Sequence, residues 1–207
     1  MRRLVWTAGI VLTVCVAGVA SFGDVQPAQR PGVAGGGVTL LPNGWKIAPA
    51  GRHVQVGDLP LAMAESPDGR LLFVASNGYN TPSIVVVDLK LLYVRATLLL
   101  DHAWLGMAWH PRGDRLYVSG AANNTIHELR WSGGALTRGQ DLVLGRPFQT
   151  SAEMDRRALT ARSFIGGLAI SPDGSRLYAA DVAAQTVTLV DAASGRVLRT
   201  VALPAEP

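Results

Sequence analysis

The chain has 207 residues, the length of a single domain or of part of a larger one. Hydrophobic residues make up 48% and charged residues 16%, with 23 glycines and 12 prolines, so the composition excludes a disordered chain and a helical bundle. The formal charge is only +4, from 19 basic and 15 acidic residues, without the clustered excess of a nucleic-acid-binding protein. We therefore expect no nucleic-acid partner.

Residues 1–20 have the layout of a secretory signal peptide. A positive segment at 1–3 precedes an uncharged stretch at 4–19 and a cleavage site after Ala20, which predicts export to the periplasm or the extracellular space. The alternative is an uncleaved anchor, because 4–22 contains 19 uncharged residues and can just cross a bilayer; only then would the chain have a membrane partner. The single cysteine, Cys15, lies in this segment, so the mature chain would have no disulfide.

Residues 21–44 are expected to form a linker that joins the signal to the folded body. Seven of the fifteen residues from 23 to 37 are Gly or Pro, and the run 35–37 has no side chain to bury. Such a composition is typical of a flexible tether.

One sequence pattern recurs three times after the linker. The segments 61–75, 105–119 and 167–180 align, and their shared prolines at 67, 111 and 172 are 44 and then 61 residues apart. A period of about 40 to 45 residues with short strands is the length of a propeller blade. The longer second interval indicates an insertion, in which we expect a short surface helix over 150–162, with a capping box at its start.

Each copy carries the same predicted succession of strands. An apolar strand leads into a Ser-Pro-Asp-Gly turn, with Ser66 first and Gly69 last, as a type I turn favours. A second strand, a polar loop, a β-branched third strand and an outer fourth strand follow; we expect them over 71–75, 84–89 and 197–203, among others. The fold class is therefore all-β, a partial propeller of about three four-stranded antiparallel blades at 57–100, 101–145 and 163–207.

The repeats resemble the YVTN-type β-propeller family, which is related to lactonase-like and surface-layer propellers. The segment 171–180 is nearly the family consensus, and Tyr117-Val118 starts the tetrapeptide that gives the family its name. The resemblance covers roughly residue 45 to the end. It implies a seven-bladed ring, so the remaining blades would be partners of this chain, which would be a fragment. The strand expected over 45–56 would complete the last blade of that ring; self-association of open arcs is the alternative.

A narrower resemblance concerns 41–52 and 101–111. They look like the N-terminal propeller of exported bacterial proteins that carry an alkaline-phosphatase-like phosphoesterase domain. In that family the metal ligands and the nucleophile lie in the downstream domain, and no position here matches them. The resemblance therefore implies no catalytic, cofactor-binding or metal residue in this segment, and a divalent metal only in a downstream domain.

Loops that lead into the inner strands and loops that join the second and third strands lie on one face of a propeller. This face is expected to gather polar and aromatic residues into a rim that binds a small molecule or a protein, although the ordinary polarity of loops explains the same residues. The rim candidates are Asn77, Asp101, His102, Trp104, Asn123, Asn124 and Asp181.

Other chemically suggestive residues have plainer interpretations. His110 replaces the turn serine and is expected to cap the turn, whereas His53 and His127 are expected to be exposed on strands. Asp68 and Asp173 occupy the same turn position in different repeats, which predicts turn stabilisation rather than a catalytic pair. The Arg-Gly-Asp tripeptide at 112–114 contains the turn glycine, so we read it as coincidence. We expect Trp109 to be wedged between blades.

Three functions compete on this evidence. The first is an exported binding or scaffolding propeller, and the second is the non-catalytic half of a phosphoesterase. The third is a lactonase-like hydrolase with its site at the propeller axis, for which only Asp101, His102 and Asp181 qualify.

Overall fold

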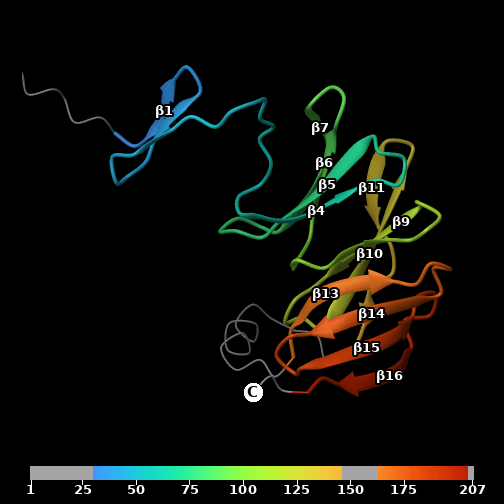
Figure 1. The fold of residues 1–207 in the computed structure, drawn as a ribbon. Coiled ribbons are helices and arrows are strands. Elements are labelled where there is room, and N and C mark those ends of the chain that lie inside the picture. The colour runs from blue at the N-terminus through green and yellow to red at the C-terminus, as the bar shows by residue number, and fades with distance from the viewer. Residues whose placement is uncertain (1–29, 146–162, 205–207) are drawn as a thin grey trace, which may run out of the picture. The chain divides into compact units, whose positions relative to one another are not determined.

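The structure, a computed structural model, describes residues 30–145 and 163–204, and the chain divides into two compact units, 1–51 and 52–207 (Figure 1). The predicted signal peptide at 1–20 and the helix at 150–162 lie outside the described residues. No helix in the described part of the chain is both long and apolar enough to span a membrane.

The described part of the first unit contains an antiparallel sheet in the order β1-β2-β3. Its strands are β1 (Gly32–Gly35), β2 (Val38–Leu40) and β3 (Lys46–Ile47). Gly36 and Gly37 connect β1 to β2 with positive φ angles of 59° and 77°, the combination that a tight hairpin turn requires. The structure thus differs from the flexible linker expected over 21–44. In the stretch 45–56, expected to be a blade strand, the only strand is β3, which pairs with β2.

Three antiparallel sheets follow in the second unit, each built by consecutive strands, as the repeats predict (Figure 1). The first sheet has β4 (Pro60–Glu65), β5 (Leu71–Ser76), β6 (Ser83–Asp88) and β7 (Tyr93–Leu99); the second has β8 (Met107–Trp109), β9 (Arg115–Ser119), β10 (Thr125–Ser132), β11 (Ala135–Arg138) and β12 (Leu142–Val143); the third has β13 (Ile165–Ile170), β14 (Arg176–Asp181), β15 (Thr186–Asp191) and β16 (Val197–Ala202). The predicted strands agree with these bounds to within a few residues.

The second sheet departs from the expected four strands because its outer strand is broken in two. β11 pairs with the end of β10 and β12 with its start. Between them, Gly139 leaves room for the buried carboxylate of Glu128, since a Cβ at Gly139 would lie 2.4 Å from Glu128 Oε1. Asp141 turns inward to the ring of the buried His127, with 2.9 Å between Oδ1 and Nδ1. The break in the outer strand thus lies beside two buried polar side chains, Glu128 and His127.

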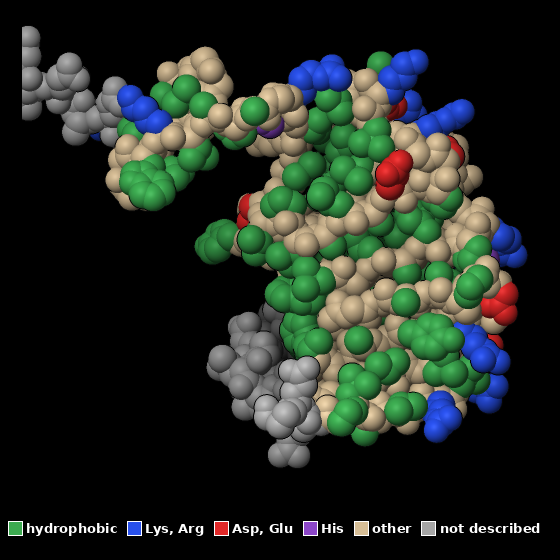
Figure 2. Space-filling model, in the orientation of Figure 1, with side chains coloured by type: hydrophobic (Ala, Val, Ile, Leu, Met, Phe, Trp, Pro, Cys, Tyr) green, Lys and Arg blue, Asp and Glu red, His purple; other side chains and the backbone are tan. Residues whose placement is uncertain are grey.

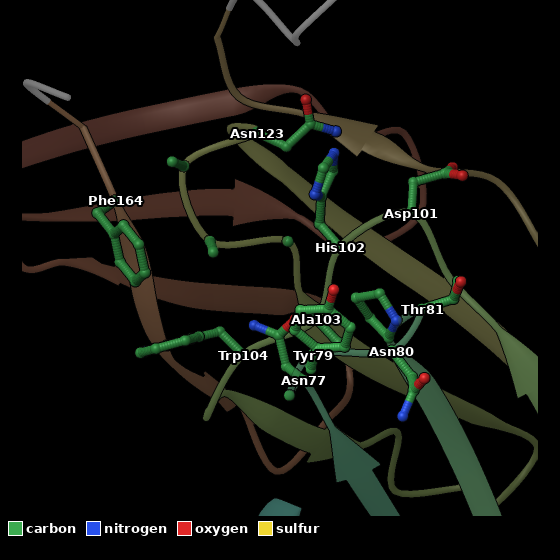
Figure 3. A pocket seen from close by; sticks show the side chains of 15 residues that line it. Asn77, Tyr79, Asn80, Thr81, Asp101, His102, Ala103, Trp104, Asn123 and Phe164 are labelled. Carbon is green, nitrogen blue, oxygen red and sulfur yellow. The ribbon is translucent and has the colours of Figure 1, made fainter. Parts of the chain in front are cut away.

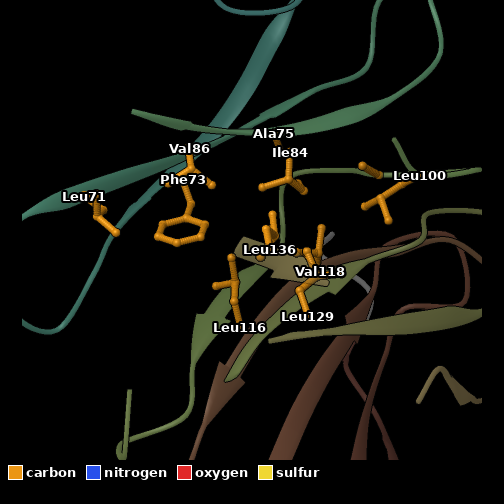
Figure 4. Close-up of a cluster of buried hydrophobic side chains, with 11 residues drawn as sticks. Leu71, Phe73, Ala75, Ile84, Val86, Leu100, Leu116, Val118, Leu129 and Leu136 are labelled. Atoms are coloured by element: carbon orange, nitrogen blue, oxygen red, sulfur yellow. The ribbon is translucent and has the colours of Figure 1, made fainter. Parts of the chain in front are cut away.

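Apolar side chains join the first sheet to the second. Phe73 is fully buried there and packs edge-on against Trp109 and Trp131, with centroids 4.8 and 5.6 Å away. The cluster also includes Ile84 and Leu116 (Figure 4). Trp109 therefore lies between two sheets, as predicted.

A second cluster joins the second sheet to the third, with Tyr117 at the same repeat position as Phe73. Tyr117 is also fully buried, whereas Tyr178, the third residue at this position, is 39% exposed. Hydrophobic side chains are visible on the surface over β13–β16 in Figure 2. The repeat position thus carries an aromatic side chain that the following sheet covers, and the third sheet has no such cover among the described residues.

The turns between the first two strands of each sheet also stack on one another. A Cβ at Gly113 would lie 3.5 Å from Pro67 of the preceding turn, and one at Gly174 would lie 2.4 Å from His110 Nε2. Both glycines have positive φ angles, of 72° and 74°. Both turns therefore favour glycine by their backbone conformation, and at Gly174 the close approach of the neighbouring turn also excludes a side chain.

Candidate functional site: a pocket at the ends of three sheets

A pocket of about 490 Å³ opens at the end of the sheets opposite the stacked turns (Figure 3). The β5–β6 loop, the segment leading into β8 and the β9–β10 loop form its walls, and Phe164, just before β13, closes one side. Its lining residues are Asn77, Gly78, Tyr79, Asn80, Thr81, Pro82, Asp101, His102, Ala103, Trp104, Gly120, Ala121, Ala122, Asn123 and Phe164. Loops that lead into inner strands and loops that join second and third strands thus lie together on one face, as expected.

The β5–β6 wall is shaped by a carboxylate from the preceding loop. Asp58 Oδ2 accepts the backbone N–H groups of Tyr79 at 2.6 Å and Asn80 at 3.0 Å. The hydrogen bond from Asn80, together with the one from Tyr79, keeps the pKa of Asp58 below its ordinary value against the opposing effect of desolvation. A Cβ at Gly78 would lie 2.4 Å from the same carboxylate oxygen, so only glycine allows this close approach.

Asp101, the single carboxylate in the pocket lining, is neutralised by Arg138. The two guanidinium nitrogens Nη1 and Nη2 donate to Asp101 Oδ2 at 3.2 and 3.1 Å. Arg138 also lies 3.5 Å from Asp141, which contacts His127. Asp101, Arg138 and Asp141 thus form a row of alternating charges from the pocket to the break in the outer strand.

His102 lines the pocket as a neutral imidazole at pH 7. Burial lowers its pKa, the nearby Asp101 acts to raise it, and His127 adds to the lowering. Because Asp101 is paired and His102 is uncharged, the described lining carries no net charge.

His127 itself corrects a prediction, because it is not exposed on its strand. Its side chain is only 1% exposed, and it lies behind Gly120 of the pocket wall. Its Nδ1 faces Asp141, and its Nε2 has no hydrogen-bond partner in the described structure. The break in the outer strand allows Asp141 to reach the edge of the ring at Nδ1.

Two aromatic rings make the apolar side of the pocket. Trp104 packs edge-on against Phe164, with centroids 5.1 Å apart and planes at 85°. The backbone N–H of Trp104 donates to the carbonyl of Ser119 at 2.9 Å, which anchors the segment to β9. The pocket therefore combines aromatic surface with amide and hydroxyl groups.

Five of the seven predicted rim residues line this pocket, and two do not. Asn77, Asp101, His102, Trp104 and Asn123 lie in its walls (Figure 3).

The other two, Asn124 and Asp181, meet at Ser163, whose Oγ lies 2.5 Å from a side-chain oxygen of each. Asp181 also accepts the backbone N–H groups of Phe164 and Ala184, both at 2.8 Å. Desolvation acts to raise the pKa of Asp181, but these hydrogen bonds, with that of Ser163, hold it below its ordinary value. Both side chains thus belong to a network that positions Phe164 rather than to the pocket surface.

The pocket residues that sequence reasoning missed are mainly Tyr79, Asn80, Thr81 and Phe164. Tyr79, Asn80 and Thr81 lie in the β5–β6 loop, in which the sequence analysis predicted only Asn77 as a rim residue. Extending that prediction to the whole loop, 77–82, would have found them. Phe164 leads directly into β13, the inner strand of the third sheet, so the rule that loops before inner strands line this face was the signal that could have found it.

The turn residues behave as predicted. The backbone N–H of Arg112 donates to His110 Nδ1 at 3.2 Å, so His110 caps its turn. Ser66 and Ser171 donate to Asp68 and Asp173 at 2.6 and 2.5 Å. These hydrogen bonds stabilise the turns that the repeat requires.

The two charged side chains of the Arg-Gly-Asp tripeptide form an ion pair with each other. Arg112 Nη2 lies 3.3 Å from Asp114 Oδ2, and Gly113 stacks on the preceding turn. Within 30–145 and 163–204, no group of three or more His, Cys, Asp or Glu side chains is arranged to hold a metal ion.

No protein-family model matches the chain, and no curated protein matches it significantly. Several solved structures are similar to the chain. The chain is similar to hydrazine synthase of Kuenenia stuttgartiensis, with TM-score 0.54, 23% identity, and coverage of 74% of this chain and 38% of that one. It is also similar to the WD40 repeats of RRP9, with TM-score 0.55, 15% identity and coverage of 73% and 41%. The β-propeller domain of Cps50 (Swd1) from Myceliophteria thermophila matches with TM-score 0.53, 12% identity and coverage of 70% and 44%.

These identities are too low to carry a function from one protein to another, so the likeness concerns the fold. The chain spans less than half the length of each of these three structures. Together with the three successive antiparallel sheets, the likeness shows an all-β partial propeller, and the three sheets are its blades.

Proposed function

We propose that this chain supplies blades of an exported β-propeller that acts as a binding or scaffolding module, with the pocket as its ligand site. The observation that carries the proposal is the convergence of loops from neighbouring blades on one pocket of about 490 Å³, a volume suited to a small ligand. The Asp101–Arg138 ion pair and the neutral His102 leave the lining without net charge. We infer a neutral ligand with several hydrogen-bonding groups and one flat face for Trp104.

The remaining blades are the proposed partners of the third blade. Support comes from Tyr178, which is 39% exposed although its two repeat equivalents are completely buried. In the propeller we propose, seven blades close the ring, and a downstream phosphoesterase domain with its own divalent metal supplies any chemistry. The segment itself is then non-catalytic.

Ligand binding is tested by NMR titration of the purified protein with a panel of neutral, anionic and cationic small molecules. We expect a neutral polyhydroxylated compound to shift the Trp104 indole and the Asn77 amide signals, and Trp104→Ala to weaken its binding at least tenfold. Thr188→Ala is the matched control, because Thr188 lies on β15 of the third blade, outside the pocket lining, and its side-chain hydrogen bond is to Thr200 Oγ1, at 3.3 Å. If no compound perturbs the pocket, the binding proposal fails.

Catalysis is tested separately with phosphomonoester, phosphodiester and lactone substrates in the presence of divalent metal. We expect no turnover by this segment. The three groups on which the hydrolase alternative depends do not converge, since Asp181 lies outside the pocket lining whereas Asp101 and His102 are within it. Robust metal-dependent turnover that Asp101→Asn abolishes would replace the binding proposal with the hydrolase.

A further inference from the structure

A second cavity, of about 380 Å³, lies at the opposite ends of the strands, beside the stacked turns. Its lining is dominated by arginines from the β8–β9 turn, the start of β9 and β10. The residues are Arg112, Asp114, Arg115, Arg130, Trp131 and Ser132. Neither the rim pocket nor the proposed function uses it.

Two of these arginines face each other directly. Arg115 of β9 and Arg130 of β10 are register partners in the antiparallel ladder, an arrangement in which like charges destabilise a sheet. Glu128 offsets the repulsion, since it accepts a hydrogen bond from Arg130 Nε at 2.8 Å and lies 3.5 Å from Arg115 Nη1. The pairing nonetheless places two guanidinium groups at one end of the sheet.

The acidic residues do not fully compensate these charges. Asp114 lies 3.3 Å from Arg112 and 3.6 Å from Arg115. Burial acts to raise the pKa of Asp114, but the two guanidinium groups hold it below its ordinary value, so the carboxylate is ionised at neutral pH. Three arginines against Asp114 and Glu128 leave one net positive charge at the cavity.

One donor in the cavity lining also lacks an acceptor. The Nε–H of Arg115 is buried and has no hydrogen-bond partner in the described structure, because Asp114 at 3.6 Å is too distant for a hydrogen bond. The Arg115 side chain is only 16% exposed. A buried donor without an acceptor costs free energy, so the protein's own groups satisfy the Arg115 guanidinium incompletely.

We propose that this cavity is an oxyanion site that binds a phosphate or carboxylate group through Arg112, Arg115 and Arg130. Planar guanidinium groups match both anions with paired hydrogen bonds, and the shared chemistry is an oxygen-bearing anion with acceptors only. Trp131 supplies an apolar wall for whatever part of the ligand adjoins the anion. The site is independent of the rim pocket, which lies at the other ends of the strands.

The test is an NMR titration of the purified protein with inorganic phosphate at constant ionic strength, with chloride as the reference salt. We expect saturable shifts at Arg115, Trp131 and Ser132, with a Kd on the order of 1 mM because the net charge is small. Acetate serves as the second arm. Tighter binding of phosphate assigns a phosphate-type ligand, and equal or tighter binding of acetate assigns a carboxylate.

Two variants remove single charges at little risk to folding. Arg112 and Arg130 have side chains that are 66% and 59% exposed, and we expect Arg112→Gln and Arg130→Gln each to raise the phosphate Kd about tenfold. The matched control is Arg95→Gln in the first blade, where Arg95 pairs with Asp88 at 3.0 Å and lines neither cavity; its Kd should change less than twofold. A response that does not saturate with either anion, or an equal loss in all three variants, overturns the proposal.

Discussion

Replacing Phe73 and Tyr178 separately by alanine compares the same repeat position in two surroundings. Phe73 is fully buried between the first and second blades, whereas Tyr178 is 39% exposed on the third blade. If the blades pack face to face as described, the two substitutions should differ greatly in their effect on the free energy of unfolding.

The expected cost at Phe73 has two parts. Truncation leaves a cavity between blades, and it removes edge-to-face contacts with Trp109 and Trp131. Core Phe→Ala substitutions cost about 3–5 kcal/mol, of which each aromatic pair contributes roughly 0.5–1.5 kcal/mol. The Tyr178→Ala change opens no closed cavity, so we expect a loss of about 1 kcal/mol or less.

The assay is urea unfolding of both variants and the unaltered protein, followed by far-UV circular dichroism, with the slope of the transition checked for constancy. Similar losses for the two variants would refute the packing of the first blade against the second, and so would a loss below about 1 kcal/mol for Phe73→Ala.

Two further predictions concern the turns. Gly174→Ala should lower the free energy of unfolding by about 1–3 kcal/mol more than Gly133→Ala, because both glycines have positive φ angles but only the Cβ at 174 meets a neighbour, 2.4 Å from His110 Nε2; equal losses in thermal unfolding would contradict the stacking of the turns. Hydrogen bonds from Ser171 and Ser175 lower the pKa of Asp173 to about 2 in the folded state, against about 3.9 in an unfolded chain. The stabilisation from Asp173 is therefore complete above about pH 4 and lost as the pH falls toward 2. We expect Asp173→Asn to flatten this part of the pH dependence of the urea midpoint, and an unchanged profile would show that the turn hydrogen bonds contribute no stability.

The blades were predictable because each repeat carries its own local signals. The Ser-Pro-Asp-Gly turn fixes where the first two strands of a blade meet, and the β-branched third strand expected over 84–89 agrees with β6 (Ser83–Asp88) to within one residue. Loop positions followed from strand order, so most rim residues were found. These features depend on neighbours in sequence, which a single chain displays directly.

The remaining features depend on contacts between distant residues. The burial of His127 requires the inward turn of Asp141, which no local pattern announces. The glycines at 35–37 suit both a tether and a tight hairpin, and only the pairing of β1 with β2 distinguishes them. The opposed pair Arg115 and Arg130 became visible only once the strand register was known.

The central claim is that successive repeats form separate sheets that pack face to face with their turns stacked. Nuclear Overhauser contacts between turns test it most directly, because they link residues that are far apart in sequence. The account predicts contacts from the His110 ring protons to the Cα protons of Gly174, and from the Pro67 ring protons to those of Gly113. The absence of both, with the two glycines contacting instead strands of a single closed sandwich or barrel, would contradict it.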